Sequence, residues 1–232
     1  MSGNKSERLG MWRRLSRFSF TREKISRPII RRFVREYAST EMTLILHPEE
    51  GLEHFPNRRV ISKRPSDEPD LLVDAAFHGL SAIPSESYGR IVCVGLLEHI
   101  SDPHRFVAEL QRILKTGGRA LLTCSSCFSL HEGPDDYFHY TPFGIRVLFR
   151  DWSGFEVLRG SCGPFTTIGI HIQRILLQCE IFPPLRPCLE VMVHTVPILD
   201  RFVTRQYFAR RMDEDTECDS MLPSNLQIVA VK

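Results

Sequence analysis

The stretch from Arg90 to Thr123 constrains the fold more strongly than any other part of the chain. Its two ends, Arg90–Val94 and Arg119–Thr123, are short and mostly apolar, which is typical of buried parallel strands. Between them, Pro103–Lys115 repeats apolar side chains at helical spacing. A strand, a helix and a second strand joined by short connections predict a βαβ unit with a right-handed crossover.

The helix of this unit has boundary signals as well as an apolar face. Asp102 is a residue type that caps helix N-termini, and Pro103 suits the first helical position. Gly117-Gly118 suits the end of the helix. The apolar face contains Phe106, Val107, Leu110, Ile113 and Leu114. One side of the helix is therefore expected to pack on the sheet.

Five further segments have the short apolar or alternating pattern of strands. They are Met42–Leu46, Arg59–Ile61, Leu71–Val73, Phe155–Arg159 and Leu226–Val231. Together with the βαβ unit, they predict an α/β domain.

The last two of these strands are separated by roughly 66 residues, which is too long for a plain loop. Thr167–Cys179 and Cys188–Arg211 have helical patterns, and the proline-rich residues 183–187 separate them. We therefore predict a helical insertion over about 164–212. Its many apolar side chains suit a core extension or a dimer face. A lid over an apolar substrate and an interfacial membrane contact are the functional alternatives.

The N-terminal residues 1–37 are strongly basic, with eleven Lys/Arg and three Glu, whereas the remainder carries nineteen basic and twenty-five acidic residues. From Met11 to Tyr37, apolar and arginine residues alternate, and Ser26-Arg27-Pro28 looks like a helix start. We divide the chain into a basic helical arm, residues 1–37, and a domain over residues 38–232. The arm is expected to pack on its own domain. Contact with an anionic membrane or with nucleic acid is the alternative.

The composition excludes several protein classes. No apolar run reaches the length of a membrane-spanning helix, and the first residues lack the apolar core of a signal peptide. We therefore expect a cytoplasmic protein. The seven cysteines are an odd number in a long chain, which argues for reduced thiols rather than a disulfide framework. Cys124 and Cys127 form a CxxC, but no second pair completes a zinc site.

Polar or small residues follow four of the predicted strands. Since ligands of open parallel sheets bind beyond the carboxyl ends of the strands, these residues are expected to gather around a ligand. They are His47-Pro48-Glu49-Glu50-Gly51, Asp74-Ala75-Ala76, Gly95-Leu96-Leu97-Glu98-His99 and Ser125-Ser126.

Three segments carry a resemblance to a known family. Residues 94–123 read VGLLEHISDPHRFVAELQRILKTGGRALLT and are similar to the LEH-x-x-DP to L-K-P-G-G block of class I S-adenosylmethionine-dependent methyltransferases, with Thr116 in place of the usual proline. Residues 131–144, HEGPDDYFHYTPFG, and 152–157, WSGFEV, resemble segments of the methyltransferase type 11 subgroup. The resemblance runs from about Leu71 to Val157. It implies a Rossmann-like, mostly parallel seven-stranded sheet of order 3-2-1-4-5-7-6, with helices on both faces and the helical insertion before the last strand.

The resemblance also implies roles for particular residues. Asp74 matches the acid that accepts a hydrogen bond from the adenine amino group, and Ala75 matches a backbone contact. Gly95 and Leu96 match the wall near the methionine part of the cofactor. His47 and Gly51 lie in the turn after the first strand, and they are assigned to the cofactor on that ground. The cofactor implied is S-adenosylmethionine.

Two departures from the family pattern concern the same cofactor site. The family's first strand is followed by G-x-G-x-G, whereas LILHPEEGLEHFP contains Gly51 alone, and Pro48 removes a backbone donor. The acid that usually ends the second strand is replaced by Ser62 and Lys63. These departures favour the alternative that the chain is an inactive binding or scaffold protein.

His131 and His139 are the candidates for catalysis. They flank an acidic turn, and either one is suited to act as the general base that deprotonates an attacking hydroxyl. The alternative is a hydrogen-bonded surface loop. For Glu98-His99, a structural role is favoured over metal binding, because two ligands are too few for a hard metal ion, and no metal is predicted.

The function predicted from these features is methyl transfer from S-adenosylmethionine to an oxygen or nitrogen of a small molecule, such as a sugar, a lipid-like compound or a secondary metabolite. Nucleic acid is disfavoured as a substrate, because GLLEH lacks the (Asp/Asn)-Pro-Pro-aromatic motif common in DNA and amino-N methyltransferases. Expected partners are the small-molecule substrate, an anionic membrane through the basic arm, and a second copy through the helical insertion.

Overall fold

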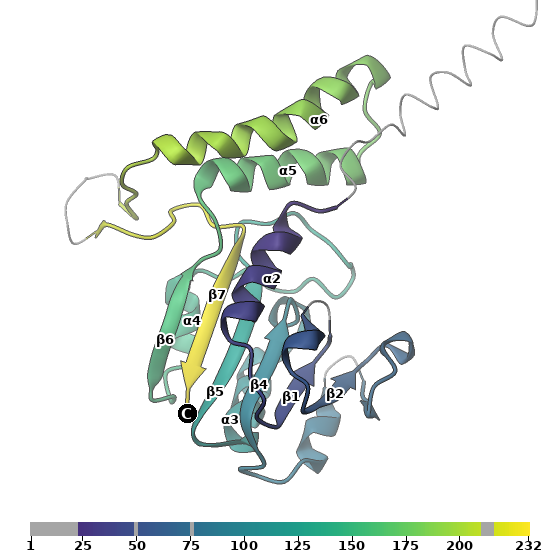
Figure 1. Cartoon of the computed structure of the whole chain (residues 1–232), viewed down its shortest axis with the longest axis vertical. Helices are drawn as coiled ribbons and strands as arrows, with labels where there is room; N and C mark the ends of the chain where they lie inside the picture. The colour runs from purple at the N-terminus through teal and green to yellow at the C-terminus, as the bar shows by residue number, and fades with distance from the viewer. Residues whose placement is uncertain (1–22, 49–50, 75–76, 210–215) are drawn as a thin grey trace, which may run out of the picture. The chain divides into compact units, whose positions relative to one another are not determined.

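The computed structural model describes residues 23–48, 51–74, 77–209 and 216–232 (Figure 1). The chain divides into two compact units. We call residues 1–27 with 162–222 the helical unit, and residues 28–161 with 223–232 the sheet unit. The division into an arm of residues 1–37 and a following domain stays a prediction.

The sheet unit contains one sheet of seven strands within the described residues, in the order β3-β2-β1-β4-β5-β7-β6. Its first five strands pair in parallel, and β7 runs antiparallel to both β5 and β6. The strands are β1 (Thr43–Leu46), β2 (Arg58–Ser62), β3 (Leu71–Leu72), β4 (Tyr88–Val94), β5 (Leu114–Ser125), β6 (Gly154–Gly160) and β7 (Asn225–Val231). The predicted fold class and strand order are confirmed.

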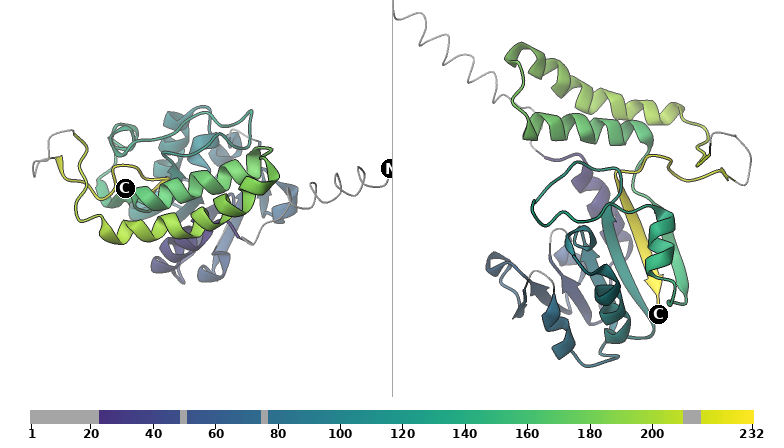
Figure 2. Two further views of the ribbon diagram at one scale, coloured as in Figure 1. Left: turned by 90° about the horizontal axis from the view of Figure 1, so that it is seen from above. Right: turned by 180° about the vertical axis from the view of Figure 1, so that it is seen from behind.

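The two faces of the sheet bury separate hydrophobic clusters because side chains alternate along each strand. Leu44 and Leu46 of β1 point into the larger cluster, whereas Ile45 points into the smaller one. Figure 2 shows α3 (Pro103–Ile113) and α4 (Pro142–Leu148) on the face opposite α2 (Ser26–Glu36), which lies in front of the sheet in Figure 1.

The βαβ unit forms as expected, with one change at the end of the helix. The Asp102 carboxylate accepts the N–H of Arg105 at 3.1 Å and so caps α3. The helix ends at Ile113, two residues earlier than predicted, because Leu114 already pairs with Tyr88 as the first residue of β5. Strand pairing therefore ends this helix before its apolar pattern does.

The N-terminal helix begins where Ser26-Arg27-Pro28 indicated. In α2, the side chains of Phe33 and Val34 are buried in the smaller cluster of the sheet unit. The earlier part of the predicted amphipathic pattern, residues 11–22, lies outside the described residues.

The helical unit contains α5 (Pro164–Gln178) and α6 (Arg186–Thr195), which lie side by side in both figures. Ile172, Leu176 and Val193 form its small core. The predicted helix over Cys188–Arg211 is too long: α6 ends at Thr195 and continues as a 3-10 helix next to Pro197, whose ring and missing N–H disfavour a continuing α-helix. None of the described helices is both long and apolar enough to cross a membrane.

Short 3-10 helices form several of the connections. They are η1 (Leu52–His54), η2 (Pro65–Asp67), η3 (His78–Ala82), η4 (Leu97–His99), η5 (Pro183–Leu185) and η6 (Val196–Phe202). Four of these, η1 to η4, follow strands at the edge of the sheet where a ligand is expected.

Candidate functional site

The strand order reverses between β1 and β4, so their carboxyl ends form the switch point at which open α/β sheets bind ligands. Leu46 of β1 is in register with Cys93 of β4. His47 follows Leu46 directly, and Gly95 comes two residues after Cys93, so both lie at this edge.

His47 is buried at the end of β1, with 2% of its surface exposed. It has φ 55°, and its backbone N–H donates to the carbonyl of Ile61 at 2.9 Å. Burial, helped by the positive charge of Arg64, lowers the pKa of His47 to about 4. His47, which the sequence assigned to the cofactor, is therefore a neutral imidazole buried away from solvent.

Gly51 has a packing role that the sequence did not show. Its φ is 81°, and a Cβ added there would lie 2.7 Å from Cγ1 of Val34 in α2. This glycine thus allows α2 to pack closely on the β1–β2 connection. Among the described residues of that connection, 47–48 and 51–57, the only helix is η1.

An acid is present near the end of β2, although not at the expected position. The Ser62 hydroxyl, fully buried, donates to the Asp67 carboxylate in η2 and accepts the N–H of Arg64 at 3.0 Å. Asp67 was missed because it follows the strand by five residues in a Pro-Ser-Asp turn. It provides the negative charge that Ser62 and Lys63 lack.

Asp74 follows β3, and about half of its side chain is exposed. One carboxylate oxygen accepts the backbone N–H of His78 at 2.8 Å, and the other lies 2.6 Å from His78 Nδ1. The hydrogen bonds from His78 lower the pKa of Asp74, which keeps it ionised. Ala75, the second residue assigned to the adenine, lies outside the described residues.

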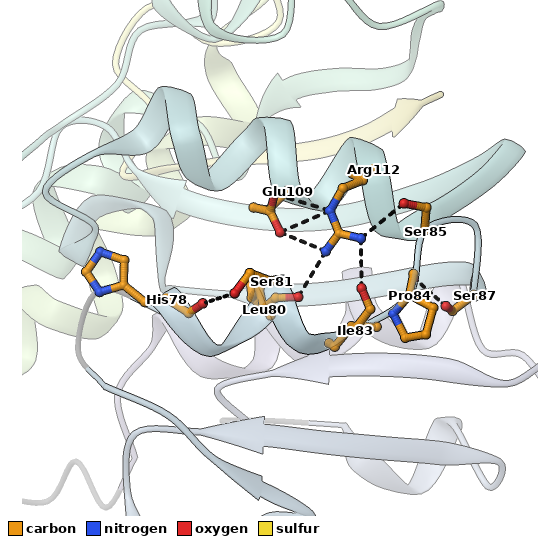
Figure 3. A network of polar contacts seen from close by, with 9 residues as sticks. All are labelled: His78, Leu80, Ser81, Ile83, Pro84, Ser85, Ser87, Glu109 and Arg112. Carbon is orange, nitrogen blue, oxygen red and sulfur yellow. Dashed lines mark hydrogen bonds and ion pairs between the residues drawn. The ribbon is translucent and has the colours of Figure 1, made fainter.

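The segment behind Asp74 is held by the Arg112 guanidinium of α3 (Figure 3). Arg112 donates to the carbonyls of Ile83 at 2.7 Å and Leu80 at 3.0 Å, and Glu109 pairs with the same guanidinium at 2.8 Å. The Ser81 hydroxyl donates to the His78 carbonyl within the same network. This network fixes η3, and through His78 it limits where Asp74 can point.

Gly95 and Leu96 follow β4 and differ in accessibility. Gly95 has φ 59° and donates its N–H to the carbonyl of Thr123 at 3.0 Å. The Leu96 side chain is buried in the larger hydrophobic cluster. Gly95 therefore presents a half-buried backbone without a side chain, whereas Leu96 can contribute only its backbone to a ligand.

The loop after β5 is joined to the ends of both β4 and β2. The N–H groups of Tyr137 and Phe138 donate to the Glu98 carbonyl at 3.0 and 3.2 Å. At the β2 end, Arg64 pairs with Glu132 at 2.9 Å. Sequence reasoning did not connect these segments, because the paired residues are far apart along the chain.

Both predicted catalytic histidines lie beside one carboxylate. Asp136 places one oxygen 3.3 Å from His131 Nδ1 and the other 3.4 Å from His139 Nε2. It also accepts the backbone N–H of His131 at 2.9 Å. A carboxylate between two imidazoles can hold both rings in place, which suits proton transfer.

Glu98 and His99 follow Gly95 in η4 and are both buried. One Glu98 oxygen accepts the hydroxyl of Ser125 at 2.8 Å and its N–H at 3.2 Å. His99 Nδ1 lies 2.7 Å from the Asp135 carbonyl. These contacts hold the β4 end against β5 and its following loop.

Comparisons with known proteins agree with this geometry. Residues 51–122 match the family model described as a methyltransferase domain. This match includes β4, α3 and the Asp74 segment. No curated protein matches the chain.

Solved structures share the fold at low sequence identity. A S-adenosylmethionine-dependent methyltransferase from Archaeoglobus fulgidus is 13% identical with a TM-score of 0.51, over 89% of this chain and 95% of that chain. In a Haloferax volcanii complex with the Trm112 methyltransferase activator, the chain described as a methyltransferase is 13% identical with a TM-score of 0.50, over 98% and 94%. These likenesses extend the fold assignment beyond the family match.

The residues at this edge fit S-adenosylmethionine in part. The exposed carboxylate of Asp74 can accept from an adenine amino group, since each of its oxygens has a second acceptor position. Gly95 allows close approach of the cofactor to the backbone. At β1, however, His47 and Gly51 are committed to burial and packing. The residues that suit S-adenosylmethionine therefore lie at the carboxyl ends of β3 and β4.

Proposed function

We propose that the chain is a class I S-adenosylmethionine-dependent methyltransferase and that it transfers a methyl group to an oxygen or nitrogen of a small molecule. The match of residues 51–122 to the methyltransferase-domain model and the strand order of the sheet support this proposal. The observation that carries the proposal is the pair formed by an exposed, ionised Asp74 and the side-chain-free Gly95 at the carboxyl edge of the sheet.

When bound, the cofactor supplies a methyl group on a positively charged sulfur, which makes that carbon electrophilic. Asp74 binds the adenine amino group, and Gly95 allows close contact with the rest of the cofactor. Asp136 orients His131 and His139, and either imidazole takes the proton from the acceptor hydroxyl or amine. Methyl transfer needs chiefly an in-line arrangement, so the loss of either histidine should slow the reaction rather than abolish it.

A second candidate function is a binding or scaffold protein that retains the fold. The buried His47 and the packing of Gly51 against Val34 favour it, because both residues serve the fold at the place where the family has its glycine-rich turn. Cofactor binding separates the two candidates.

Calorimetric titration with S-adenosylmethionine and S-adenosylhomocysteine tests the proposal. We expect binding, and Asp74→Ala should weaken it by ~1–3 kcal/mol because the adenine donor loses its partner. Asp151→Ala, a substitution in the turn before β6, is the matched control and should leave the affinity unchanged. No heat at millimolar ligand would support the scaffold function, and an unchanged affinity of Asp74→Ala would show that adenine binds elsewhere.

The helical unit suggests where the protein acts. Several large apolar side chains of this unit are exposed. They include Ile168, Ile175, Leu177, Phe182, Leu185, Val191, Met192, Ile198, Leu199 and Phe202. In a chain whose first 37 residues have a balance of eleven basic to three acidic residues, such a surface favours peripheral contact with an anionic membrane. The expected compartment is the cytoplasm.

Cosedimentation with anionic and zwitterionic vesicles tests this contact. We expect binding to anionic vesicles that falls with salt and with Phe202→Glu. Phe143→Glu introduces the same charge on α4 of the sheet unit and is the control. A concentration-dependent dimer that Phe202→Glu dissociates, with no vesicle binding, would assign the apolar surface to a second copy instead.

A further inference from the structure

The buried end of β4 and the loop after β5 bring together a carboxylate and two imidazoles that the proposed methyl transfer does not use as a set. One ligand-type atom from each of Glu98, His99 and His131 lies within 4.8 Å of the other two. Glu98 and His99 come from η4, and His131 comes from the loop. The sequence showed only the first two, so the third candidate ligand emerges from the fold.

Glu98 carries an independent sign that something binds here. It is 1% exposed, and its Oε1 accepts two hydrogen bonds from Ser125. Its Oε2 is buried and has no hydrogen-bond partner among the described residues. A buried carboxylate oxygen without a partner is costly, so this atom calls for a cation or a donor.

Both imidazoles are held by their Nδ1 atoms. His99 Nδ1 lies 2.7 Å from the Asp135 carbonyl. His131 Nδ1 lies 3.2 Å from the Ser129 carbonyl and 3.3 Å from an Asp136 oxygen. An Nδ1–H that donates to a carbonyl or carboxylate places the lone pair on Nε2, which is the arrangement found in histidines that ligate metals.

We propose that Glu98, His99 and His131 bind one divalent first-row transition metal ion. Two imidazoles and one carboxylate are the ligand set of zinc and related ions, whereas magnesium and calcium prefer oxygen ligands alone. Ligand atoms around a tetrahedral ion stand roughly 3.4 Å apart at metal–nitrogen distances of about 2.1 Å. The ligand atoms of this cluster, which lie within 4.8 Å of one another, would therefore move closer together around an ion.

Three protein ligands leave at least one coordination position open, as in catalytic metal sites. Glu98 and His99 come three and four residues after Gly95, which we assign to the cofactor site. The open position on the metal therefore suits an oxygen or nitrogen of the methyl acceptor. This consequence rests on the proposed function, whereas metal binding itself does not.

Zinc titration of the full chain, without cofactor or acceptor, tests the site by calorimetry and elemental analysis. We expect one Zn²⁺ per chain. Glu98→Gln keeps an acceptor for Ser125 but removes the charge, and His131→Ala removes a ligand from a loop. Each should lower the affinity by at least about 10–100-fold, the range seen when even an outer partner of a metal ligand is lost. His104→Ala removes an exposed histidine of α3 and is the matched control.

Substitution with Co²⁺ supplies a second readout. We expect d–d absorption of a site with nitrogen and oxygen ligands, without thiolate charge-transfer bands from the seven cysteines, and its loss in His131→Ala. No stoichiometric Zn²⁺ binding, equal affinity of His131→Ala and wild type, or thiolate bands would overturn the proposal. The edge-to-face contact of the His99 and His131 rings, with centroids 4.9 Å apart, would then be a packing contact only. Metal binding without cofactor binding would contradict the proposed function and leave the metal site in place.

Discussion

Acidification should destabilise this protein through His47 in particular. The folded chain holds the pKa of His47 at about 4 against an ordinary 6.5, because the ring is buried and Arg64 is nearby. Below pH 6.5 the unfolded chain binds a proton on His47, whereas the folded chain binds this proton only below about pH 4. Stability is therefore lost as pH falls through this window, and no further loss from His47 occurs below it.

The size of the effect follows from the two pKa values. The gap between 6.5 and about 4 corresponds to about 3 kcal/mol when complete. Linkage gives a loss of about 1.3 kcal/mol by pH 5.5 and about 2.5 kcal/mol by pH 4.5, relative to pH 7.5. Carboxylates titrate in the same range, so the wild-type curve alone does not isolate the histidine.

The variant His47→Asn isolates it, because asparagine tolerates the positive φ of this position and does not titrate. Urea unfolding at pH 7.5, 6.5, 5.5 and 4.5 should show the wild type losing about 2–3 kcal/mol more than the variant. Side-chain NMR titration reports the pKa directly, and Arg64→Ala should raise it because a nearby positive charge is removed. Parallel pH profiles of wild type and variant, or a His47 pKa near 6.5, would refute the reasoning.

Three further predictions concern packing and buried polar contacts. Gly51→Ala should destabilise the chain by ~2–4 kcal/mol in urea unfolding, because the new Cβ meets Val34 and the residue has a positive φ. Gly117→Ala should cost only about 1–2 kcal/mol, because Gly117 has φ 74° but an added Cβ would meet no atom of the described residues within 4 Å, its chain neighbours aside. Equal losses in the two variants would contradict the packing argument. Arg112→Ala should lower the thermal midpoint of unfolding and speed amide hydrogen exchange in residues 80–83, because the carbonyls of Leu80 and Ile83 lose their donor. Unchanged exchange in these residues would show that η3 is held by other contacts. Gln173→Ala should speed amide hydrogen exchange at Ile25, because the N–H of Ile25 donates to the Gln173 side chain at 3.0 Å within the helical unit. Gln178→Ala, at an exposed position, should not change exchange at Ile25. Equal exchange at Ile25 in the two variants would show that this hydrogen bond does not protect it.

The sheet was predictable because its signals are local. Periodicity, caps and glycines placed the βαβ unit, and the strand order followed from the family resemblance that this unit carries. At the end of α3, a neighbour distant in sequence decided the outcome. The pairing of Leu114 with Tyr88 ended α3 early, and no local pattern contains that information.

The candidate site was predictable to a smaller extent. The contact between Asp74 and His78 spans four residues, so a search for acid–histidine spacing would have found it. The Glu98, His99 and His131 cluster instead requires η4 and the loop after β5 to meet, a tertiary contact. The sequence therefore identified Glu98, His99 and His131 as separate candidates, but it did not show that the three lie together.

The connection between β1 and β2 shows how the sheet can form although the glycine-rich cofactor turn of the family is missing. Adjacent parallel strands usually need a crossover helix to join them and to cover one face of the sheet. Here the described part of the connection has only η1, and Phe33 and Val34 of α2 bury that face together with Phe55. Gly51 allows α2 to approach the connection closely. That packing stabilises the sheet whether or not a cofactor binds, so the presence of the fold carries little information about the β1 half of the site. The β3 and β4 half does carry it, because packing does not require an exposed, ionised Asp74 or an accessible Gly95 backbone.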